Sequence, residues 1–234
     1  MSDYIDIATP DGTFQALIVH PTSAVAPVVV VLQEIFGIND DMKATCQELA
    51  DRGYIAICPD LFWRQEPGLS LSHWSEAEWK KGLALYEAFD LDKGVADITD
   101  TMATACALPR ASGKIGAMGF CLGGLMTFLT TARVGTDASV AYYPGGSDQH
   151  IAEAGKLASP LIVHLGEEDE FISKAAQRTI REGLAANGHA KVFSYPGCSH
   201  AFARHTGTHY DAAAAALANG RTWAHFDRYL RVGQ

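Results

Sequence analysis

A cysteine between two closely spaced glycines is the strongest chemical signal in this 234-residue sequence. Residues 119–123 read Gly-Phe-Cys-Leu-Gly, after an apolar segment typical of a strand and before one typical of a helix. This is the pattern of a nucleophile held on a sharp strand-to-helix turn, which needs small residues two positions to either side. Cys121 is therefore predicted to be a nucleophile, because the positive end of the following helix dipole stabilises a thiolate. The Leu122 backbone N–H is predicted to donate to an oxyanion.

An acid and then a histidine follow Cys121, in the chain order that such a nucleophile requires. Asp169 lies just beyond an apolar strand predicted at 160–165, and His200 lies in the loop after the next strand. We predict a Cys121, His200 and Asp169 triad. Glutamates at 167, 168 and 170 compete with Asp169, and the sequence separates the four carboxylates poorly. The alternative is a solvated acidic loop with a surface histidine.

A second strand end carries a further group of interest. Residues 33–37 read Gln-Glu-Ile-Phe-Gly and follow the apolar run 28–32. The Ile35 backbone N–H is a candidate second oxyanion donor, since the loop after an early central strand supplies that donor in such sites. A carboxylate such as Glu34 at an apolar strand end is costly unless it is paired. Glu34 is therefore either an ion-paired residue or a proton acceptor for the thiol.

A short segment rich in histidine raises the question of a metal. Cys198, His200, His205 and His209 lie within a dozen residues. Their spacing matches no usual set of zinc ligands, and five cysteines without a CxxC pair argue against a structural zinc site or a disulfide framework. We expect no metal or cofactor, and we expect His205 and His209 to face solvent.

The elements that must position these residues alternate between strands and helices. The alternation predicts an α/β fold with a mostly parallel central sheet of about 7–8 strands and helices on both faces. Functional side chains then gather at the carboxyl ends of the strands. The predicted strands are 14–20, 28–33, 54–58, 114–119, 138–143, 160–165 and 191–195, and the predicted helices are 41–52, 75–88, 92–107, 122–133, 174–186 and 211–229.

Composition excludes several classes of protein. Hydrophobic residues make up 48% and the net charge is −9, with no basic run of the kind that binds a nucleic-acid backbone. The longest apolar runs, 28–32 and 212–218, are far too short to span a bilayer. The first residues lack the pattern of a secretory signal, so we expect a cytoplasmic protein. We also expect a monomer and a single domain over 1–234, with 62–74 as an excursion within it.

Taken together, these segments resemble the dienelactone hydrolases, the carboxymethylenebutenolidases of the α/β-hydrolase superfamily. The stretches that carry the resemblance are 33–37, 119–124, 166–169 and 200–204, with 88–90 and 213–222 in support. The resemblance spans nearly the whole chain in the right order. It implies hydrolysis of dienelactone to maleylacetate in aromatic degradation, without cofactor or metal.

The resemblance also implies individual roles. Cys121, His200 and Asp169 would form the triad, and Glu34 would hold the resting thiol and take its proton when substrate arrives. Arg204 would bind a substrate carboxylate. The family's second arginine, in the region before residues 88–90, has no counterpart here, where the sequence reads Glu-Trp-Lys-Lys at 78–81. Lys80 or Lys81 is the candidate replacement, although lysine lacks the bidentate fork of arginine; Arg64 is a weaker candidate.

The sequence also allows other functions. A family member with another ester, lactone or thioester substrate is favoured by the lysines at 80 and 81, and a preference for neutral substrates would support it. A non-catalytic protein of the same fold would be supported by an unreactive Cys121, since fold alone does not fix function. A disulfide oxidoreductase is disfavoured because no second cysteine lies near Cys121 in the sequence.

Overall fold

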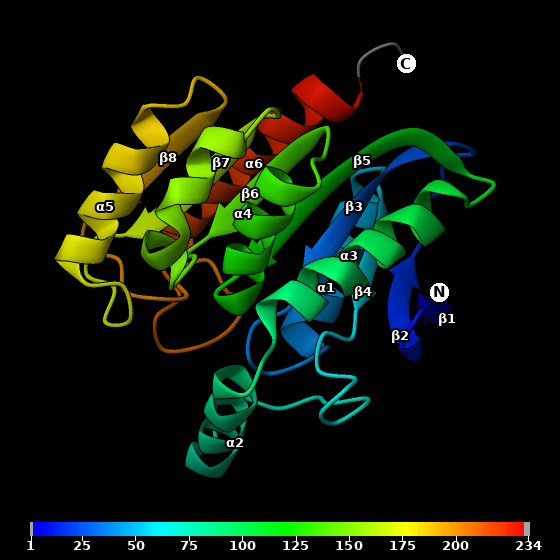
Figure 1. Cartoon of the computed structure of the whole chain (residues 1–234), viewed down its shortest axis with the longest axis horizontal. Helices are drawn as coiled ribbons and strands as arrows, with labels where there is room; N and C mark the ends of the chain where they lie inside the picture. The colour runs from blue at the N-terminus through cyan, green and yellow to red at the C-terminus, as the bar shows by residue number, and fades with distance from the viewer. Residues whose placement is uncertain (1, 232–234) are drawn as a thin grey trace. The chain divides into compact units, whose positions relative to one another are not determined.

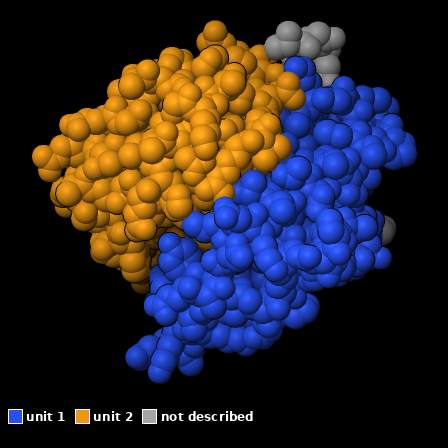
Figure 2. All heavy atoms as spheres, in the orientation of Figure 1, with its two compact units in different colours: residues 1–116 blue, residues 117–234 orange. Residues whose placement is uncertain are grey.

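The structure is a computed structural model that describes residues 2–231. Its chain divides into two compact units, Met1–Gly116 and Ala117–Gln234, which Figure 2 distinguishes by colour. Eight strands and six α-helices lie within the described residues. The boundary between the units falls inside strand β5 (Ala111–Phe120).

The first unit contains a mixed set of four strands. They are β1 (Ser2–Thr9), β2 (Gly12–Val19), β3 (Ala26–Leu32) and β4 (Ile55–Pro59), adjacent in the order β1-β2-β4-β3. β1 and β2 form an antiparallel hairpin, β2 pairs antiparallel with β4, and β3 and β4 are parallel. Every residue of β3 is buried, as its run of valines requires of a strand covered on both faces.

Three helices belong to this unit, and all begin at a capping side chain. They are α1 (Asp40–Asp51), α2 (Glu76–Glu87) and α3 (Leu91–Cys106). The side chains of Asn39, Ser75 and Asp90 accept hydrogen bonds from the first turns of these helices. The predicted helices 41–52, 75–88 and 92–107 lie within one residue of the observed ends.

The second unit is built on parallel strands. β6 (Ala138–Tyr142), β7 (Leu161–Gly166) and β8 (Ala190–Tyr195) are neighbours in that order and pair in parallel. Helix α4 (Leu122–Arg133) precedes β6, and α5 (Lys174–Ala185) lies between β7 and β8 in sequence. Helix α6 (Ala212–Leu230) follows β8 and lies along β6 and β7 (Figure 1). The predicted α/β class with a mostly parallel sheet is confirmed.

Two elements were not predicted. β1 alternates polar and apolar residues only briefly, and it is stabilised by its register with β2, in which Tyr4 pairs with Leu17 and Ile7 with Phe14. The 3-10 stretch η1 (Ser147–Lys156) has no regular apolar period and packs against α4 and α5. Both depend on contacts that local sequence does not encode.

A buried histidine lies in the middle of β7. The His164 ring is completely buried, with Nδ1 2.8 Å from the Tyr195 hydroxyl and Nε2 3.2 Å from the Thr222 hydroxyl. Burial, reinforced by the charge of Arg221, lowers the pKa of His164 to about 3. The native protein therefore holds this ring neutral at a pH where an unfolded chain protonates it.

This histidine predicts an acid-sensitive fold. Between the unfolded pKa near 6.5 and the folded value, unfolding takes up a proton, so stability falls as pH falls, by at most about 1.4 kcal/mol per pH unit for one site. Urea unfolding at pH 6 and pH 5 should show that the free energy of unfolding falls more steeply with decreasing pH in the wild type than in His164→Asn. Equal slopes for the two proteins would contradict this origin of the acid sensitivity.

Candidate active site

Cys121 occupies a strained turn between β5 and α4. Its backbone has φ 54° and ψ −114°, a left-handed conformation that is costly for a residue with a side chain. Two hydrogen bonds hold it there: Cys121 N–H donates to the Tyr142 carbonyl at 3.1 Å, and Leu125 N–H donates to the Cys121 carbonyl at 3.1 Å. The sharp turn expected from the sequence is present.

The glycine two positions earlier is required by close packing. A Cβ at Gly119 would lie 2.0 Å from the Gly123 carbonyl oxygen and 2.7 Å from the Thr127 hydroxyl. The first turn of α4 can approach the end of β5 only because this side chain is absent. The Gly-x-Cys-x-Gly spacing is thus a steric condition for the turn that presents Cys121.

His200 and Asp169 meet directly within the second unit. His200 Nδ1 lies 2.7 Å from Asp169 Oδ2, and both side chains are almost fully buried. The other oxygen of Asp169 accepts the backbone N–H groups of Phe171 and Ile172 at 2.8 and 2.9 Å. The carboxylate is therefore fixed from both sides and orients the imidazole.

Two of the three rival carboxylates have other partners. Glu168 forms an ion pair with Lys174 at 2.8 Å on the surface, and Glu170 Oε2 accepts the backbone N–H of His200 at 3.1 Å. Asp169 is thus the carboxylate that the structure brings to the His200 ring, which the sequence could not decide.

His209 holds the same loop, a role that the sequence did not reveal. Its Nδ1 lies 3.1 Å from the His200 carbonyl oxygen and 3.2 Å from Glu170 Oε1. Glu170 and His209 therefore hold the backbone of His200 at both its N–H and its carbonyl. The expectation that His205 and His209 are exposed is confirmed, with 44% of the His209 side chain exposed. The two contacts that His209 makes with this loop were not predicted.

The electrostatics of His200 reflect its neighbours. Burial is the largest single influence and lowers the pKa, but the negative charge of Cys121 and the hydrogen bond with Asp169 outweigh it and raise the pKa of His200 to about 10. This environment favours the protonated form of the His200 ring.

Two aromatic rings enclose the imidazole. The Tyr143 ring centroid lies 4.8 Å from that of His200, and the Phe171 ring meets it edge to face at 5.0 Å. Sequence reasoning missed both. Tyr143 could have been predicted as a site residue, because it directly follows the carboxyl end of β6, where functional residues gather. Phe171 is 55% exposed and carries no pattern of its own.

Glu34 and Ile35 lie in the first unit, in the loop that follows β3. Both are buried, with 2% and 4% of their surfaces exposed. Hydrogen bonds tie this loop to the excursion: Ile38 N–H donates to the Leu69 carbonyl at 3.1 Å, and Leu71 N–H to that of Phe36 at 2.8 Å. The excursion 62–74 therefore fixes the backbone around Ile35.

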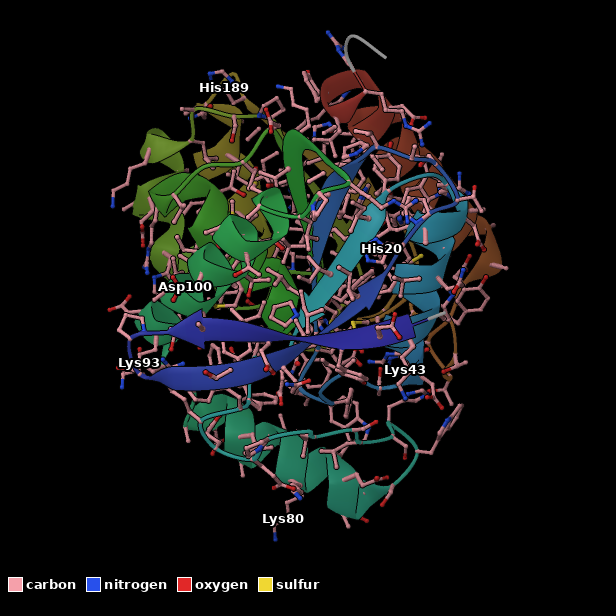
Figure 3. All side chains as sticks on the ribbon, turned by 90° about the vertical axis from the view of Figure 1, so that its right-hand side faces the viewer. His20, Lys43, Lys80, Lys93, Asp100 and His189 are labelled. Atoms are coloured by element: carbon pink, nitrogen blue, oxygen red, sulfur yellow. The ribbon has the colours of Figure 1, made fainter. Side chains whose placement is uncertain are left out.

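The two candidate lysines lie on α2 of the same unit. Lys81 Nζ forms an ion pair with Glu66 Oε1 at 2.6 Å, so its charge is already compensated. Lys80 is exposed and extends away from the helix (Figure 3). Arg64 is bound to Asp97 and Asp11 and lies 4.3 Å from the centroid of the Trp63 ring. These contacts give all three cations structural or solvent-facing positions.

Arg204 lies in the second unit, in the loop between β8 and α6 and four residues after His200. It is buried, with 8% of its surface exposed, and its N–H donates to the Ala201 carbonyl at 3.0 Å. Ala201 itself has φ 59°, so the backbone turns sharply between the two residues.

Searches for a metal or membrane element gave no candidate. Residues 2–231 contain no group of three or more histidine, cysteine or acidic side chains arranged to hold a metal ion. Within the same residues, no helix is long and apolar enough to cross a bilayer.

Comparison with known proteins points to one family. The sequence model of the dienelactone hydrolase family matches residues 14–230. A carboxymethylenebutenolidase of Pseudomonas putida is 39% identical over 222 residues, covering 94% of each chain. Carboxymethylenebutenolidase 1 of Cupriavidus pinatubonensis is 34% identical and covers 95% of each.

Solved structures give the same result at the level of fold. A protein from Klebsiella pneumoniae assigned to the dienelactone hydrolases superimposes with a TM-score of 0.86 at 27% identity, over 98% of this chain and 99% of its own. An esterase of Pyrococcus furiosus, at 14% identity, reaches a TM-score of 0.74 over 98% and 93%. The fold is that of the α/β-hydrolases.

The Asp169–His200 contact generates a prediction. Asp169→Asn keeps an oxygen for the two backbone N–H groups but removes the charge that orients the ring, and the equivalent change in a serine triad lowers kcat about 10⁴-fold. We expect a loss of at least about 10²-fold in ester hydrolysis, with an unchanged circular dichroism spectrum. Glu168→Gln is the matched control and should keep full activity. An Asp169→Asn enzyme within threefold of wild type would contradict the assignment.

Proposed function

This chain belongs to the dienelactone hydrolase family and is a hydrolase of ester bonds, and we propose that it opens a small anionic enol-lactone through an acyl-thioester on Cys121. The proposed substrate is dienelactone, as for the named carboxymethylenebutenolidases, and the product is maleylacetate. The observation that carries the proposal is the buried Asp169–His200 pair. The pKa of His200 is raised by Asp169 and by Cys121, which lies on a strained turn.

The first half of the proposed reaction is acylation. The sulfur of Cys121 forms a bond to the lactone carbonyl carbon, and the resulting oxyanion accepts hydrogen bonds from the N–H groups of Leu122 and Ile35. One such donor is worth about 3–4 kcal/mol in comparable sites. The ring C–O bond then breaks, so the substrate stays attached as a thioester and leaves an enolate oxygen. The role of Ile35 rests on the family resemblance and on its fixed, buried loop.

The enolate explains why a cysteine suits this substrate. A thiolate attacks well but is also a good leaving group, so a tetrahedral intermediate with an ordinary alkoxide would return to reactants. An enolate is a stabilised leaving group, so its departure from the tetrahedral intermediate competes with departure of the thiolate. A cysteine at the elbow therefore favours an enol-lactone over a simple alkyl ester.

The second half is deacylation. His200, oriented by Asp169, takes a proton from water, and the hydroxide equivalent forms a bond to the thioester carbon. The C–S bond breaks and the thiolate is restored. His200 then passes its proton to the enolate oxygen, so the net change is addition of one water. Glu34, by resemblance, takes the proton of the resting thiol when substrate arrives.

One observation favours a broader substrate range. Lys81 is paired with Glu66 and Lys80 extends away from α2, so neither takes over the missing second arginine in this arrangement. Arg204 is then the main carboxylate anchor proposed here, and another lactone or ester with one carboxylate is the second candidate substrate class. A single domain, a monomeric state and a cytoplasmic location stay predictions.

The nucleophile is tested by substitution. Cys121→Ala should reduce opening of cis- and trans-dienelactone to the uncatalysed rate, because no C–S bond can form. Cys106→Ala removes the exposed cysteine of α3 and is the matched control, which should keep wild-type activity. Turnover by Cys121→Ala would overturn the mechanism, whereas a slow lactone rate with active ester cleavage by the wild type would overturn only the substrate.

The carboxylate anchor is tested by comparing two substrates. Arg204→Ala should raise KM for dienelactone at least tenfold and change kcat/KM for neutral p-nitrophenyl acetate less than threefold, since only the lactone carries a carboxylate. Lys80→Ala should leave both unchanged. Equal losses on the charged and neutral substrates would mean that Arg204 has a structural role only.

A further inference from the structure

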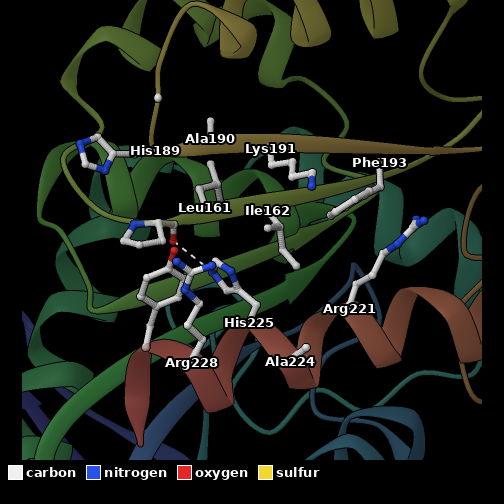
Figure 4. Close-up of a pocket in the computed structure, with 13 residues that line it drawn as sticks. Leu161, Ile162, His189, Ala190, Lys191, Phe193, Arg221, Ala224, His225 and Arg228 are labelled. Atoms are coloured by element: carbon white, nitrogen blue, oxygen red, sulfur yellow. Dashed lines mark hydrogen bonds between the residues drawn. The ribbon is translucent and has the colours of Figure 1, made fainter. Parts of the chain in front are cut away.

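A cationic groove lies in the second unit, between α6 and the exposed face of β8. It has a volume of about 530 Å³, in the range of small-molecule sites. Figure 4 shows Lys191 and Phe193 entering it from β8, and Arg221 and Arg228 from α6. No acidic side chain in the described part of the chain lines it.

The three cations of this groove lack ion-pair partners. Lys191, Arg221 and Arg228 form no salt bridge with any residue between 2 and 231, although the chain carries nine more negative than positive side chains. By contrast, Arg231, which directly follows α6, pairs with Asp227 at 2.9 Å. Three unpaired cations around one hollow produce a local positive field that attracts anions.

Aromatic rings hold these cations in place. The Arg221 guanidinium lies 4.2 Å from the Phe193 ring centroid and donates to the Tyr195 hydroxyl at 3.0 Å. Lys191 Nζ lies 4.9 Å from the same ring, and Arg228 lies 5.2 Å from the ring of Tyr229. The charges are therefore pre-positioned, which lowers the entropy lost when an anion binds.

The histidine between the arginines adds no charge at neutral pH. His225 Nε2 lies 3.4 Å from the Pro160 carbonyl oxygen, and burial, together with the charge of Arg228, lowers its pKa to about 4. With Ile162 and Ala224 it gives the groove an uncharged middle section. The cations thus lie toward its ends.

Helix geometry sets the spacing of the two arginines. Arg221 and Arg228 are seven residues apart, so they share one face of α6 and their backbones are about 10 Å apart. An extended molecule with an acid at each end matches this spacing. Guanidinium groups bind carboxylates through paired hydrogen bonds.

The groove is separate from the hydrolytic residues. Its strand residues include Leu161 and Ala190, the first residues of β7 and β8, whereas Asp169 and His200 follow the carboxyl ends of the same strands. A six-residue strand spans about 20 Å. The opposite strand ends therefore carry different sites.

We propose that this groove is a second binding site, for an extended organic dianion with two carboxylates and an apolar middle. The inference does not depend on the hydrolytic mechanism, since none of its residues takes part in that proposal.

Calorimetric titration of the full chain with adipate tests the site. Adipate should bind at least tenfold more tightly than hexanoate, its matched monoanion, and than inorganic phosphate. Arg228→Gln and Lys191→Gln, both at exposed positions, should each weaken adipate binding at least fivefold, and Arg221→Gln should do the same. Arg231→Gln, at the residue that directly follows α6, is the control and should bind normally. All four should hydrolyse p-nitrophenyl acetate at the wild-type rate.

Adipate binding at the hydrolytic site is distinguished by Arg204→Ala. That variant should keep adipate binding within twofold of wild type. Loss of binding in Arg204→Ala with normal binding in the groove variants would overturn the proposal. Equal affinity for adipate, hexanoate and phosphate would overturn it as well, because the site would then not recognise two separated acids.

Discussion

The hydrogen bond between Asp169 and His200 is the constraint on which the proposed chemistry depends. Two ionisable side chains are buried here at 2.7 Å, and such burial is tolerated only when the charges are paired and their other polar atoms satisfied. The backbone N–H groups of Phe171 and Ile172 satisfy Asp169. Glu170 and His209 hold the backbone of His200. The ring is left with Nε2 as its available atom.

Parallel strand pairing brings these groups together. β7 and β8 are in register with Gly166 opposite Tyr195, so the loops that follow them begin side by side. A Cβ at Gly166 would lie 2.6 Å from the Cys198 carbonyl oxygen, so only glycine lets the loop of His200 approach the end of β7 so closely. The positions of the acid and the base thus follow from strand register and one missing side chain.

Much of this arrangement is predictable from local sequence, and the reasons are physical. The alternation of strand-like and helix-like segments indicates the elements, and Gly119 and Gly123 indicate the turn of Cys121. The choice of Asp169 among four carboxylates was not predictable, because it depends on which oxygen reaches the His200 ring across 31 residues of chain. The contact of His209 with the His200 carbonyl and the packing of the Tyr143 ring on His200 were not predictable either, because both join residues through the tertiary fold. The cationic groove was missed because its cations come from β8 and α6, and no sequence motif joins them.

The central claim is that substrate becomes covalently attached to Cys121 and that His200 releases it. Intact-protein mass spectrometry of His200→Gln after rapid mixing with dienelactone tests this most directly. The account predicts a mass increase equal to the whole lactone, because ring opening loses no atoms, and peptide mapping should locate it on Cys121. An unmodified Cys121 in an enzyme that still consumes the lactone, or an adduct on another residue, would contradict the account.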